Sequence, residues 1–414
     1  MTTYDPTTKA GSDRSDDVSR SGRQAGSSPT VGVIVDPVYS HGRGILRGIT
    51  TYGLGHAWQF RRPTGWFFDA LPDILSWRVD GLIASLHDES MVAFVRTMNV
   101  PTVNIASSYS YGDWPSAICD NHLIGKMAAQ HYVDRGLRSL AYVGHPTARW
   151  STERFSGFES VIQEVGLTCQ VCPFNVFART DGGSQSSGFR QWLATLPPQT
   201  GVFAGNDSIA EIVLATALEA GLNVPEQLAV VGVDNDEMTA QMTTPALTSV
   251  DANSERIGHE AARILESMLN GASPPTEPIR IPPIGVVARA SSDVLALADD
   301  DVRSAVRFIR DHAASPISVD DVLAEVPLSR RPLEKRFRKV LGRSILDEIH
   351  RVHVERAAQL LVGTDLSMPD VARASGFATY TRMGIVFRKL TGRSPTGHRS
   401  QFRPTRAGYA RLSL

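Results

Sequence analysis

One helical pattern occurs twice within the last hundred residues of the chain. The first copy spans residues 317–344 and the second spans residues 366–395, and both contain Gly-Arg-Ser near their ends. In each copy a short helical segment, a break and a second helical segment follow one another. The second segments begin near Ser329 and Ala378, 49 positions apart, and each has apolar residues spaced to form one buried face. The sequence therefore predicts an all-α domain that contains two helix-turn-helix units.

Charge divides unevenly between this end of the chain and the rest. Residues 300–414 contain 21 Lys and Arg against 12 Asp and Glu, whereas residues 1–299 contain 21 against 31, and the whole chain has a net charge of −1. A basic segment of this kind is typical of proteins that bind nucleic acid, because cationic side chains neutralise phosphate groups. Two basic helix-turn-helix units predict a grip on two segments of one double-stranded DNA.

The rest of the chain alternates between short apolar runs and segments with helical periodicity. The apolar runs are residues 31–35, 81–84, 101–105, 139–143, 201–204 and 228–233, and the helical segments are residues 45–52, 88–98, 121–135, 151–165 and 207–220. Runs that are apolar throughout predict strands buried on both faces, in parallel sheets covered by helices. The expected fold class is an α/β core of this kind followed by the all-α domain.

Polar side chains follow several of the apolar runs. Asp36, Asp234 and Asn235 come directly after two of them, and Asp207 begins the helical segment after a third. Ligands of parallel sheets bind beside the carboxyl ends of the strands. Carboxylate and amide groups can bind paired hydroxyls, and an aromatic ring such as Trp150 can stack on a sugar face. These residues are therefore candidates for binding a small polyol, with helix capping as an equal alternative for Asp207.

Three further features limit the class of protein. Residues 1–29 are rich in Ser, Thr, Asp and Gly, which predicts a disordered tail and excludes a signal peptide. No run approaches the roughly 18 apolar residues that span a membrane, so a cytoplasmic location and no membrane partner are expected. The three cysteines argue against a disulfide framework. Cys169 and Cys172 lie in an apolar stretch that predicts a buried strand rather than a zinc or redox site.

Residues 30–290 resemble the effector-binding core of LacI-type regulators, which is similar to periplasmic sugar-binding proteins. The matching stretches are residues 135–144, 150–158, 205–210, 221–237 and 245–250. The resemblance implies a two-lobed core that divides near residue 137, with Arg154 in contact with the effector. The effector-binding residues expected are Asp36, Asp120, Trp150, Arg154, Asp207, Asp234 and Asn235.

Residues 303–403 resemble the AraC-type DNA-binding domain. The matching stretches are residues 329–337, 357–361, 376–377, 387–395 and 398–399. A LacI-type core joined to an AraC-type domain resembles the xylose-operon regulator family, in which a pentose binds the core. The resemblance implies a homodimer and adds RNA polymerase to the expected partners. Residues 291–302 are expected to be a linker between the two parts, and residues 404–414 a short tail.

The second helix of each unit carries the residues expected to contact DNA. A recognition helix reads bases from its N-terminal half, so Arg331, Glu334 and Lys335 are the base readers predicted for the first unit. Basic residues further along a helix, such as Arg388 and Lys389, are expected to contact phosphates. The full predicted set is Ser329, Arg330, Arg331, Glu334, Lys335 and Arg338 in the first unit, and Thr379, Tyr380, Thr381, Arg382, Arg388 and Lys389 in the second.

The two units are expected to differ in how strictly they read sequence. Ile385 stands where the AraC-type family commonly has a basic residue, so we expect the first helix to set specificity and the second to tolerate more variation. Between the units, residues 345–361 predict a helix of about 25 Å at roughly 1.5 Å per residue. A rigid spacer of this length can place both helices in successive major-groove segments, roughly 34 Å apart.

Two other classes of function compete with a DNA-binding regulator. A solute-binding protein without a DNA role would fit the core, but the basic C-terminal domain speaks against it. An enzyme is disfavoured because the sequence has no metal-ligand cluster, nucleophile elbow or phosphate-binding loop. No cofactor, catalytic residue or metal site is expected. The expected function is a transcription regulator of carbohydrate-utilisation genes controlled by a small sugar, with a non-sugar effector left open.

Overall fold

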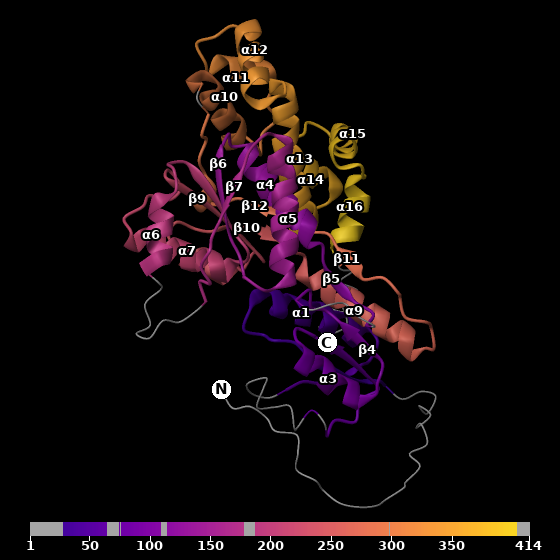
Figure 1. Ribbon diagram of the computed structural model, residues 1–414. Helices are drawn as coiled ribbons and strands as arrows, with labels where there is room; N and C mark the ends of the chain where they lie inside the picture. The colour runs from indigo at the N-terminus through magenta and orange to yellow at the C-terminus, as the bar shows by residue number, and fades with distance from the viewer. Residues whose placement is uncertain are drawn as a thin grey trace, which may run out of the picture.

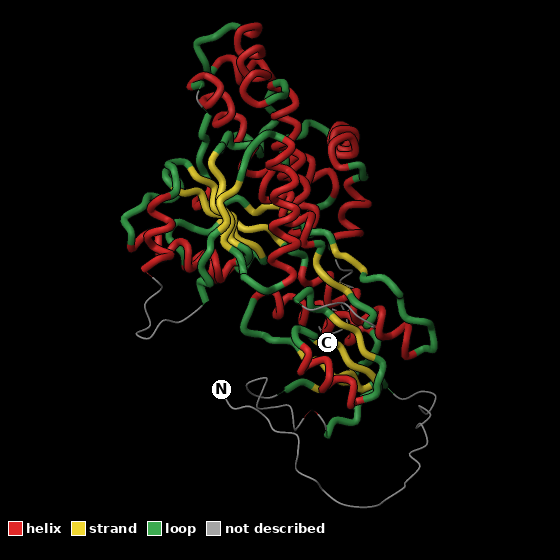
Figure 2. The backbone as a smooth tube through the Cα atoms, in the orientation of Figure 1, coloured by secondary structure: helices red, strands yellow, loops and turns green. Residues whose placement is uncertain are grey.

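The computed structural model describes residues 28–63, 74, 76–108, 114–177, 187–297 and 299–403. It has an α/β core of two lobes and, beyond it, an all-α domain (Figure 1). The strands gather in separate sheets with helices around them (Figure 2). This architecture confirms the fold class predicted from the sequence. The predicted tails at 1–29 and 404–414 lie almost wholly outside the described residues.

The first lobe has a four-stranded parallel sheet in the order β2-β1-β3-β4. Its strands are β1 (Thr30–Ile34), β2 (Gln59–Arg61), β3 (Gly81–Ala84) and β4 (Thr102–Asn104), and its helices are α1 (Ser40–Gly55), α3 (Glu89–Met98) and α9 (Ser254–Leu269). Helices α1 and α9 touch through glycines. A Cβ on Gly48 would lie 1.9 Å from the carbonyl oxygen of Glu255. A side chain there would push the two helices apart, so the glycine sets how closely α9 covers α1.

The second lobe has a six-stranded sheet in the order β12-β10-β9-β8-β6-β7, in which β12 alone is antiparallel. Its strands are β6 (Ser139–Val143), β7 (Cys169–Val171), β8 (Thr200–Ala204), β9 (Leu228–Val233), β10 (Thr248–Asp251) and β12 (Gly285–Val287), and its helices are α4 (Asn121–Val133), α5 (Arg149–Glu164), α6 (Ser187–Thr195), α7 (Asp207–Glu219) and α8 (Glu237–Met242). Every residue of β8 and β9 is buried, as the predicted two-sided covering requires.

The prediction of a buried strand around the two cysteines is wrong. Strand β7 lies at the edge of the sheet, and its Gln170 and Val171 are exposed while Cys169 and Cys172 are half-buried. An edge strand is covered on fewer sides than a central one, which apolar composition alone does not reveal. Burial raises the pKa of Cys169 to about 12 and that of Cys172 to about 11, so both thiols stay protonated near neutral pH.

Over its described residues the chain passes between the lobes three times. The passages run from β5 (Ala117–Cys119) to α4, from β10 to α9, and from β11 (Ile279–Ile281) to β12, and β5 pairs with β11 in a two-stranded parallel sheet. The first passage is therefore near residue 120 rather than near 137. Helix α4 packs on the second sheet, where the Tyr132 hydroxyl donates to the Val202 carbonyl oxygen at 2.6 Å. Periodicity predicted the helix but not the sheet that it covers.

The segment predicted as a linker is part of the core for half its length. A short 3-10 helix, η1 (Ala290–Ser292), buries Ser291 and Ser292 completely. The Ser291 hydroxyl donates to the Val230 carbonyl oxygen at 2.7 Å and accepts from the Thr248 amide at 2.8 Å. The Ser292 hydroxyl contacts His131 Nε2 at 2.8 Å. The segment thus fastens β9, β10 and α4 to one another before the chain leaves the core.

The helical domain consists of two three-helix units that share a long central helix. The helices are α10 (Asp300–Asp311), α11 (Val319–Ala324), α12 (Arg330–Leu341), α13 (Ile345–Gly363), α14 (Met368–Ala374), α15 (Tyr380–Thr391) and α16 (Pro395–Phe402). One apolar core gathers around Leu333 and Phe337 and the other around Met383 and Phe387. Helix α13 contributes to both cores, so it holds the two units at a fixed separation.

The second helices of the two units, α12 and α15, match position by position. Ser329 and Thr379 are their N-terminal caps, and Gly342 and Gly392 are their C-terminal caps with φ of 71° and 74°. The helices are therefore offset by 50 positions, not 49. The predicted buried face is confirmed on both helices, because Leu333 and Phe337 of α12 and Met383 and Phe387 of α15 have no exposed surface. Leu390, which the same spacing places on the face of α15, is instead 48% exposed.

Candidate effector site and DNA-binding surface

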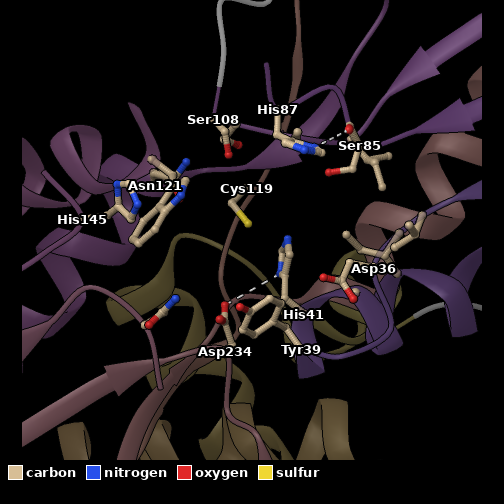
Figure 3. A pocket seen from close by; sticks show the side chains of 18 of the residues that line it. Asp36, Tyr39, His41, Ser85, His87, Ser108, Cys119, Asn121, His145 and Asp234 are labelled. Atoms are coloured by element: carbon tan, nitrogen blue, oxygen red, sulfur yellow. Dashed lines mark hydrogen bonds and ion pairs between the residues drawn. The ribbon is translucent and has the colours of Figure 1, made fainter. Parts of the chain in front are cut away.

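A cavity of about 560 Å³ lies between the two lobes of the core. Part of its wall is made by residues that come one or two positions after strands β1, β3, β4, β6, β8 and β9, so it lies at the carboxyl ends of both sheets. Helices α1, α4 and α5 and strand β5 supply most of the rest. Figure 3 shows side chains from both lobes turned toward this space. The polar residues that line it are Asp36, Tyr39, His41, Ser85, His87, Ser107, Ser108, Asn121, His145, Asn206, Arg154 and Asp234.

Arg154 of α5 forms the rigid part of the second-lobe wall. It is only 4% exposed, and its Nε donates to Asn121 Oδ1 at 3.0 Å while its Nη1 donates to the Gly205 carbonyl oxygen at 2.5 Å. Its guanidinium carbon lies 5.0 Å from the ring centre of Trp150. Two hydrogen bonds and an aromatic face fix this side chain before any ligand arrives, which leaves its Nη2 turned toward the carboxylate of Asp234 at 3.9 Å.

Asp234 supplies a buried acceptor on the same wall. Its backbone φ is 107° and that of Asn235 is 50°, values that non-glycine residues rarely adopt. Among the described residues no group donates a hydrogen bond to its buried Oδ1, although Arg154 and His41 lie at 3.9 and 3.8 Å. A buried acceptor without a partner costs about 1–3 kcal/mol, and a ligand that donates a hydrogen bond to it removes this cost.

The first-lobe wall presents imidazole groups. His41 Nδ1 contacts the Ser254 hydroxyl at 2.7 Å, and burial lowers the pKa of His41 below 6.5, which Asp234 partly offsets. Its ring is therefore neutral at pH 7 and offers one donor and one acceptor. His87 Nδ1, also on the first lobe, is 3.0 Å from the Ser85 carbonyl oxygen. His145 faces the cavity from the second lobe, where it follows β6, and its Nδ1 accepts from the Ala148 amide at 3.2 Å. Cys119 faces the same cavity, and burial raises its pKa to about 12.

Four of the seven predicted effector-binding residues line the cavity: Asp36, Trp150, Arg154 and Asp234. The other three have different partners. Asp207 is 3% exposed and accepts from the Ser249 hydroxyl at 2.6 Å and the Asp236 amide at 2.8 Å. Its burial, with the charge of Asp234, raises its pKa well above 3.8.

Asn235 and Asp120 are also occupied outside the cavity. The Asn235 side chain accepts from Arg289 at 2.7 Å and donates to Asp251 at 3.2 Å. Asp120 caps α4 by accepting from the Leu123 amide at 3.0 Å. The lining residues His41, Asn121, His145 and Asn206 were missed. The sequence does hold a signal for Asn206, which stands immediately before a predicted helix and next to the predicted Asp207.

The exposed face of α12 is strongly charged. Arg330, Arg331, Lys335 and Arg338 are exposed, whereas the Glu334 side chain is 23% exposed and lies 4.0 Å from Arg338 Nε. Arg336 is also exposed, but it turns toward α10, where it pairs with Asp299 and Asp301 at 3.5 and 2.9 Å. The structure thus gathers the predicted readers of the first unit on one outward surface, with Ser329 exposed at its start.

The corresponding face of α15 holds fewer charges. The predicted residues Thr379, Tyr380, Thr381, Arg382, Arg388 and Lys389 are all exposed. The Thr379 hydroxyl accepts from the Arg382 amide at 3.2 Å and so caps the helix. Arg382 Nη2 lies 3.5 Å from His350 of α13. Ile385 is exposed between Thr381 and the basic pair.

Known proteins share both parts of this arrangement. Residues 129–292 match the periplasmic binding protein-like domain, and residues 322–401 match a helix-turn-helix domain. The xylose operon regulatory protein of Escherichia coli (strain K12) is 33% identical over 333 residues, which cover 79% of this chain and 85% of that protein. This chain belongs to the xylose operon regulatory protein family.

Further similarities agree with this family. The xylose operon regulatory protein of Haemophilus influenzae is 31% identical over 318 residues, which cover 75% of this chain and 82% of the relative. The structure of the xylose-binding transcription activator xylR aligns over 91% of this chain and 98% of its own, with 29% identity and a TM-score of 0.57. Members of the xylose operon regulatory protein family are transcription regulators rather than enzymes, and this chain is a regulator with a helix-turn-helix DNA-binding domain. Within the described ranges, no helix has the length and apolar character needed to cross a membrane.

In this chain the core and the helical domain meet at a buried ion-pair cluster. Asp134, directly after α4, accepts from Arg343 Nη1 at 2.9 Å and pairs with Arg351 Nη1 at 3.3 Å. Both arginines also bind Glu348 of α13, which has no exposed surface, at 2.6 and 2.8 Å. Burial opposes the ionisation of Glu348, but Arg351 and Arg343 overcome it and lower its pKa to about 2. The cluster therefore holds its charges in the neutral pH range.

Proposed function

We propose that this chain regulates carbohydrate-utilisation genes in response to a small neutral sugar, with a pentose such as xylose as the effector. The observation that carries the proposal is the cavity between the lobes, where Arg154 and Asp234 of one lobe face His41 of the other. A related protein of known structure is described as xylose-binding. The expected setting is the cytoplasm, where an intracellular sugar and the chromosome are both present.

The chemistry of the cavity favours a neutral polyol. A sugar hydroxyl both donates and accepts, and the wall alternates a fixed donor (Arg154), an acceptor without a partner (Asp234 Oδ1) and a neutral imidazole (His41). Trp150 adds an apolar face on which a sugar ring can stack. An anionic ligand would meet the carboxylates of both Asp36 and Asp234, and this like-charge contact disfavours it.

Binding of such a ligand favours the closed arrangement of the lobes. His41 and Asp234 lie on opposite lobes 3.8 Å apart, and Arg43 Nη2 of the first lobe lies 2.9 Å from Asp236 Oδ2 of the second. A ligand that bonds to both walls interacts better with the closed form than with an open one. This difference in affinity is what allows an effector to shift a conformational equilibrium.

Helix α4 is the proposed connection between the cavity and the DNA-binding domain. Its first residue, Asn121, accepts the hydrogen bond from Arg154, and Asp134, which follows its last residue, holds Arg343 and Arg351. Thirteen helical residues span about 20 Å at roughly 1.5 Å per residue. A change in the angle between the lobes at residue 120 would thus be carried by one rigid helix to the base of α13.

We further propose that the regulator works as a homodimer and that contact with RNA polymerase accompanies activation. Met238 and Met242 of α8 are 66% and 79% exposed one helical turn apart, which gives the second lobe an apolar patch that a second copy can cover. Two copies would bring four recognition helices to the DNA, and analytical ultracentrifugation of the full-length chain tests the assembly.

Titration calorimetry and gel shift test the proposal together. We expect the full-length chain to bind D-xylose or another pentose more tightly than D-glucose, and the sugar to change its affinity for the promoter beside its own gene. Arg154→Lys keeps the charge but loses the hydrogen-bond geometry, so sugar affinity should fall about 10- to 100-fold. Arg190→Lys, at an exposed ion pair of the same lobe, is the matched control.

Two results would contradict the proposal. If calorimetry detects no heat of binding with any pentose or hexose, the proposal that a sugar is the effector is wrong. If no gel shift occurs at low salt, with or without sugar, the chain does not regulate the promoter beside its own gene.

A further inference from the structure

The two recognition helices carry different chemistry at equivalent positions. The offset of 50 pairs Arg331 with Thr381, Glu334 with Gly384 and Lys335 with Ile385, while Arg338 pairs with Arg388 and keeps its type. These positions are spaced i, i+3, i+4 and i+7, so each set forms one stripe opposite the buried phenylalanine. The centre of the stripe is charged on α12 and uncharged on α15.

Ile385 is an exposed apolar group in the middle of this stripe. Its side chain is 61% exposed, and Tyr380, the first residue of the helix, is 42% exposed. The two residues border a shallow hollow of about 590 Å³ that is also lined by Thr381, Gly384, Arg388, Lys389, Ser394 and Pro395. With this exposure the isoleucine contributes little to packing among the described residues, and a recognition face is otherwise among the most polar surfaces of a regulator. The exposed side chain therefore calls for an apolar partner outside the chain.

Gly384 gives a second and independent indication. It lies in the middle of α15, where glycine costs about 1 kcal/mol relative to alanine. A Cβ built at this position would meet nothing within 4 Å, so the fold of the chain itself does not require the glycine. A missing side chain on an outward helix face lets another molecule approach the helix backbone closely. The hollow beside Ile385 is thus opened by the glycine.

In the major groove the one apolar group that a base edge presents is the C5-methyl group of thymine. We propose that α15 reads thymine methyl groups, with Ile385 as the specificity-determining residue and Gly384 as the position that lets the helix approach the base edge. This rests on the DNA-binding role of the helix-turn-helix domain. Arg388 at the end of the stripe and Lys389 beside it can hold the phosphates, while the methyl of Thr381 extends the apolar surface.

The proposal replaces the expectation that the second helix simply tolerates more variation. An apolar contact of this kind distinguishes a base pair containing thymine from the others without any hydrogen bond. Burying one methyl group contributes a factor of about 4 in affinity, because about 0.8 kcal/mol is gained per buried carbon group at 1.4 kcal/mol per tenfold. Selectivity by α15 should therefore be smaller at each position than that of Arg331 on α12, and independent of salt.

Replacement of thymine by deoxyuridine tests the proposal, because it removes the methyl group and leaves every hydrogen-bonding group in place. A duplex is first selected from a random pool by the full-length chain and mapped by hydroxyl-radical footprinting. Each thymine in it is then replaced in turn, and the affinity is measured by fluorescence anisotropy. We expect about a 4-fold loss at one or two positions in the half-site of α15, and none of this loss in Ile385→Ala.

Two further variants make the result decisive. Gly384→Ala should raise the melting temperature slightly, because alanine favours helix, yet weaken binding to the selected duplex. Lys335→Ala, the equivalent position of α12, should keep the full sensitivity to deoxyuridine. Uniform insensitivity of the wild-type chain to deoxyuridine, or equal sensitivity in Ile385→Ala, would overturn the methyl-reading role. Failure to select any duplex would instead overturn sequence-specific DNA binding as a whole.

Discussion

The buried Glu348 makes a quantitative prediction about how the helical domain is held. Glu348→Gln keeps the size and shape of the side chain and removes its charge. Arg343 and Arg351 then lose their shared partner in the domain while they stay largely buried, at 20% and 25% side-chain exposure. Among the residues that the structure describes, Asp134 of the core remains as the one carboxylate that contacts both arginines. The substitution therefore tests whether the ion-pair cluster stabilises the domain or merely fills space.

Two physical arguments give the same size of effect. The pKa of Glu348 falls from an ordinary value of 4.5 to about 2, which corresponds to about 3 kcal/mol of stability at neutral pH. Removing one partner of a buried ion pair typically costs about 3–5 kcal/mol. Because the pKa is lowered in the folded state, this stability is fully present above about pH 4.5 and is lost as the pH falls toward 2.

The distribution of tryptophan makes the assay selective. All six tryptophans precede residue 193, so tryptophan fluorescence follows the core alone, whereas circular dichroism at 222 nm follows the helices of both parts. In a urea titration at pH 7, we expect Glu348→Gln to lower the free energy of unfolding of the helical domain by about 3 kcal/mol. The fluorescence transition should move less.

The matched control is Glu325→Gln, at an exposed position of the same domain, which should change stability by less than about 0.5 kcal/mol. The difference between Glu348→Gln and wild type should also shrink at pH 3. A loss below 1 kcal/mol at pH 7, or an undiminished loss at pH 3, would show that the charges of the cluster do not stabilise the domain.

Three further predictions concern control and recognition. Asp134→Asn should leave sugar affinity within about 2-fold of wild type but reduce the effect of the sugar on DNA affinity. If that effect is as large as in wild type, α4 does not connect the cavity to the DNA-binding domain. Arg331→Ala should relax preference at one base pair by about 1–3 kcal/mol, whereas Arg388→Ala should weaken all sequences alike and lower the salt slope by about one; the reverse pattern would exchange their roles. Because burial lowers the pKa of His41, sugar affinity should stay constant from pH 8 to 6.5 and change only below that range, and His41→Asn should remove the change; a midpoint above 6.5 would contradict this.

The local sequence predicted the bounds of strands and helices better than it predicted which side chains line the cavity. Strands β3, β6 and β9 have the predicted bounds because apolar runs of fixed length are ended by polar residues. The direction of a side chain after a strand depends on backbone angles and on neighbouring strands. Asp234 turns into the cavity through a φ of 107°, whereas Asn235, one residue later, turns away toward Arg289. No periodicity in the sequence distinguishes these two neighbours.

Long-range packing explains the remaining differences. The lobe to which α4 belongs is decided by Tyr132, whose hydroxyl bonds to strands 70 and 97 residues further along the chain. Asn121 enters the site through Arg154, 33 residues away. Such partners are invisible in a local pattern, although the polar residues that begin helices after strands are the correct places to look for them. The paired helix caps, by contrast, are local and fix the register of the two recognition helices.

The buried hydrogen bonds of Ser291 and Ser292 determine where the chain can be cut to separate the effector-binding core from the DNA-binding domain. A fragment cut at residue 290 would leave the Val230 carbonyl and the Thr248 amide without their partners, at a cost of about 1–3 kcal/mol each. A chimera with a foreign DNA-binding domain therefore has to keep residues 290–297 with the core and exchange the chain only from α10 onward. Because the DNA-binding domain is joined to the effector-binding core by packed residues and not by a flexible linker, we expect an effector to change the orientation of the recognition helices. It would not act by changing how freely the domain moves near the DNA.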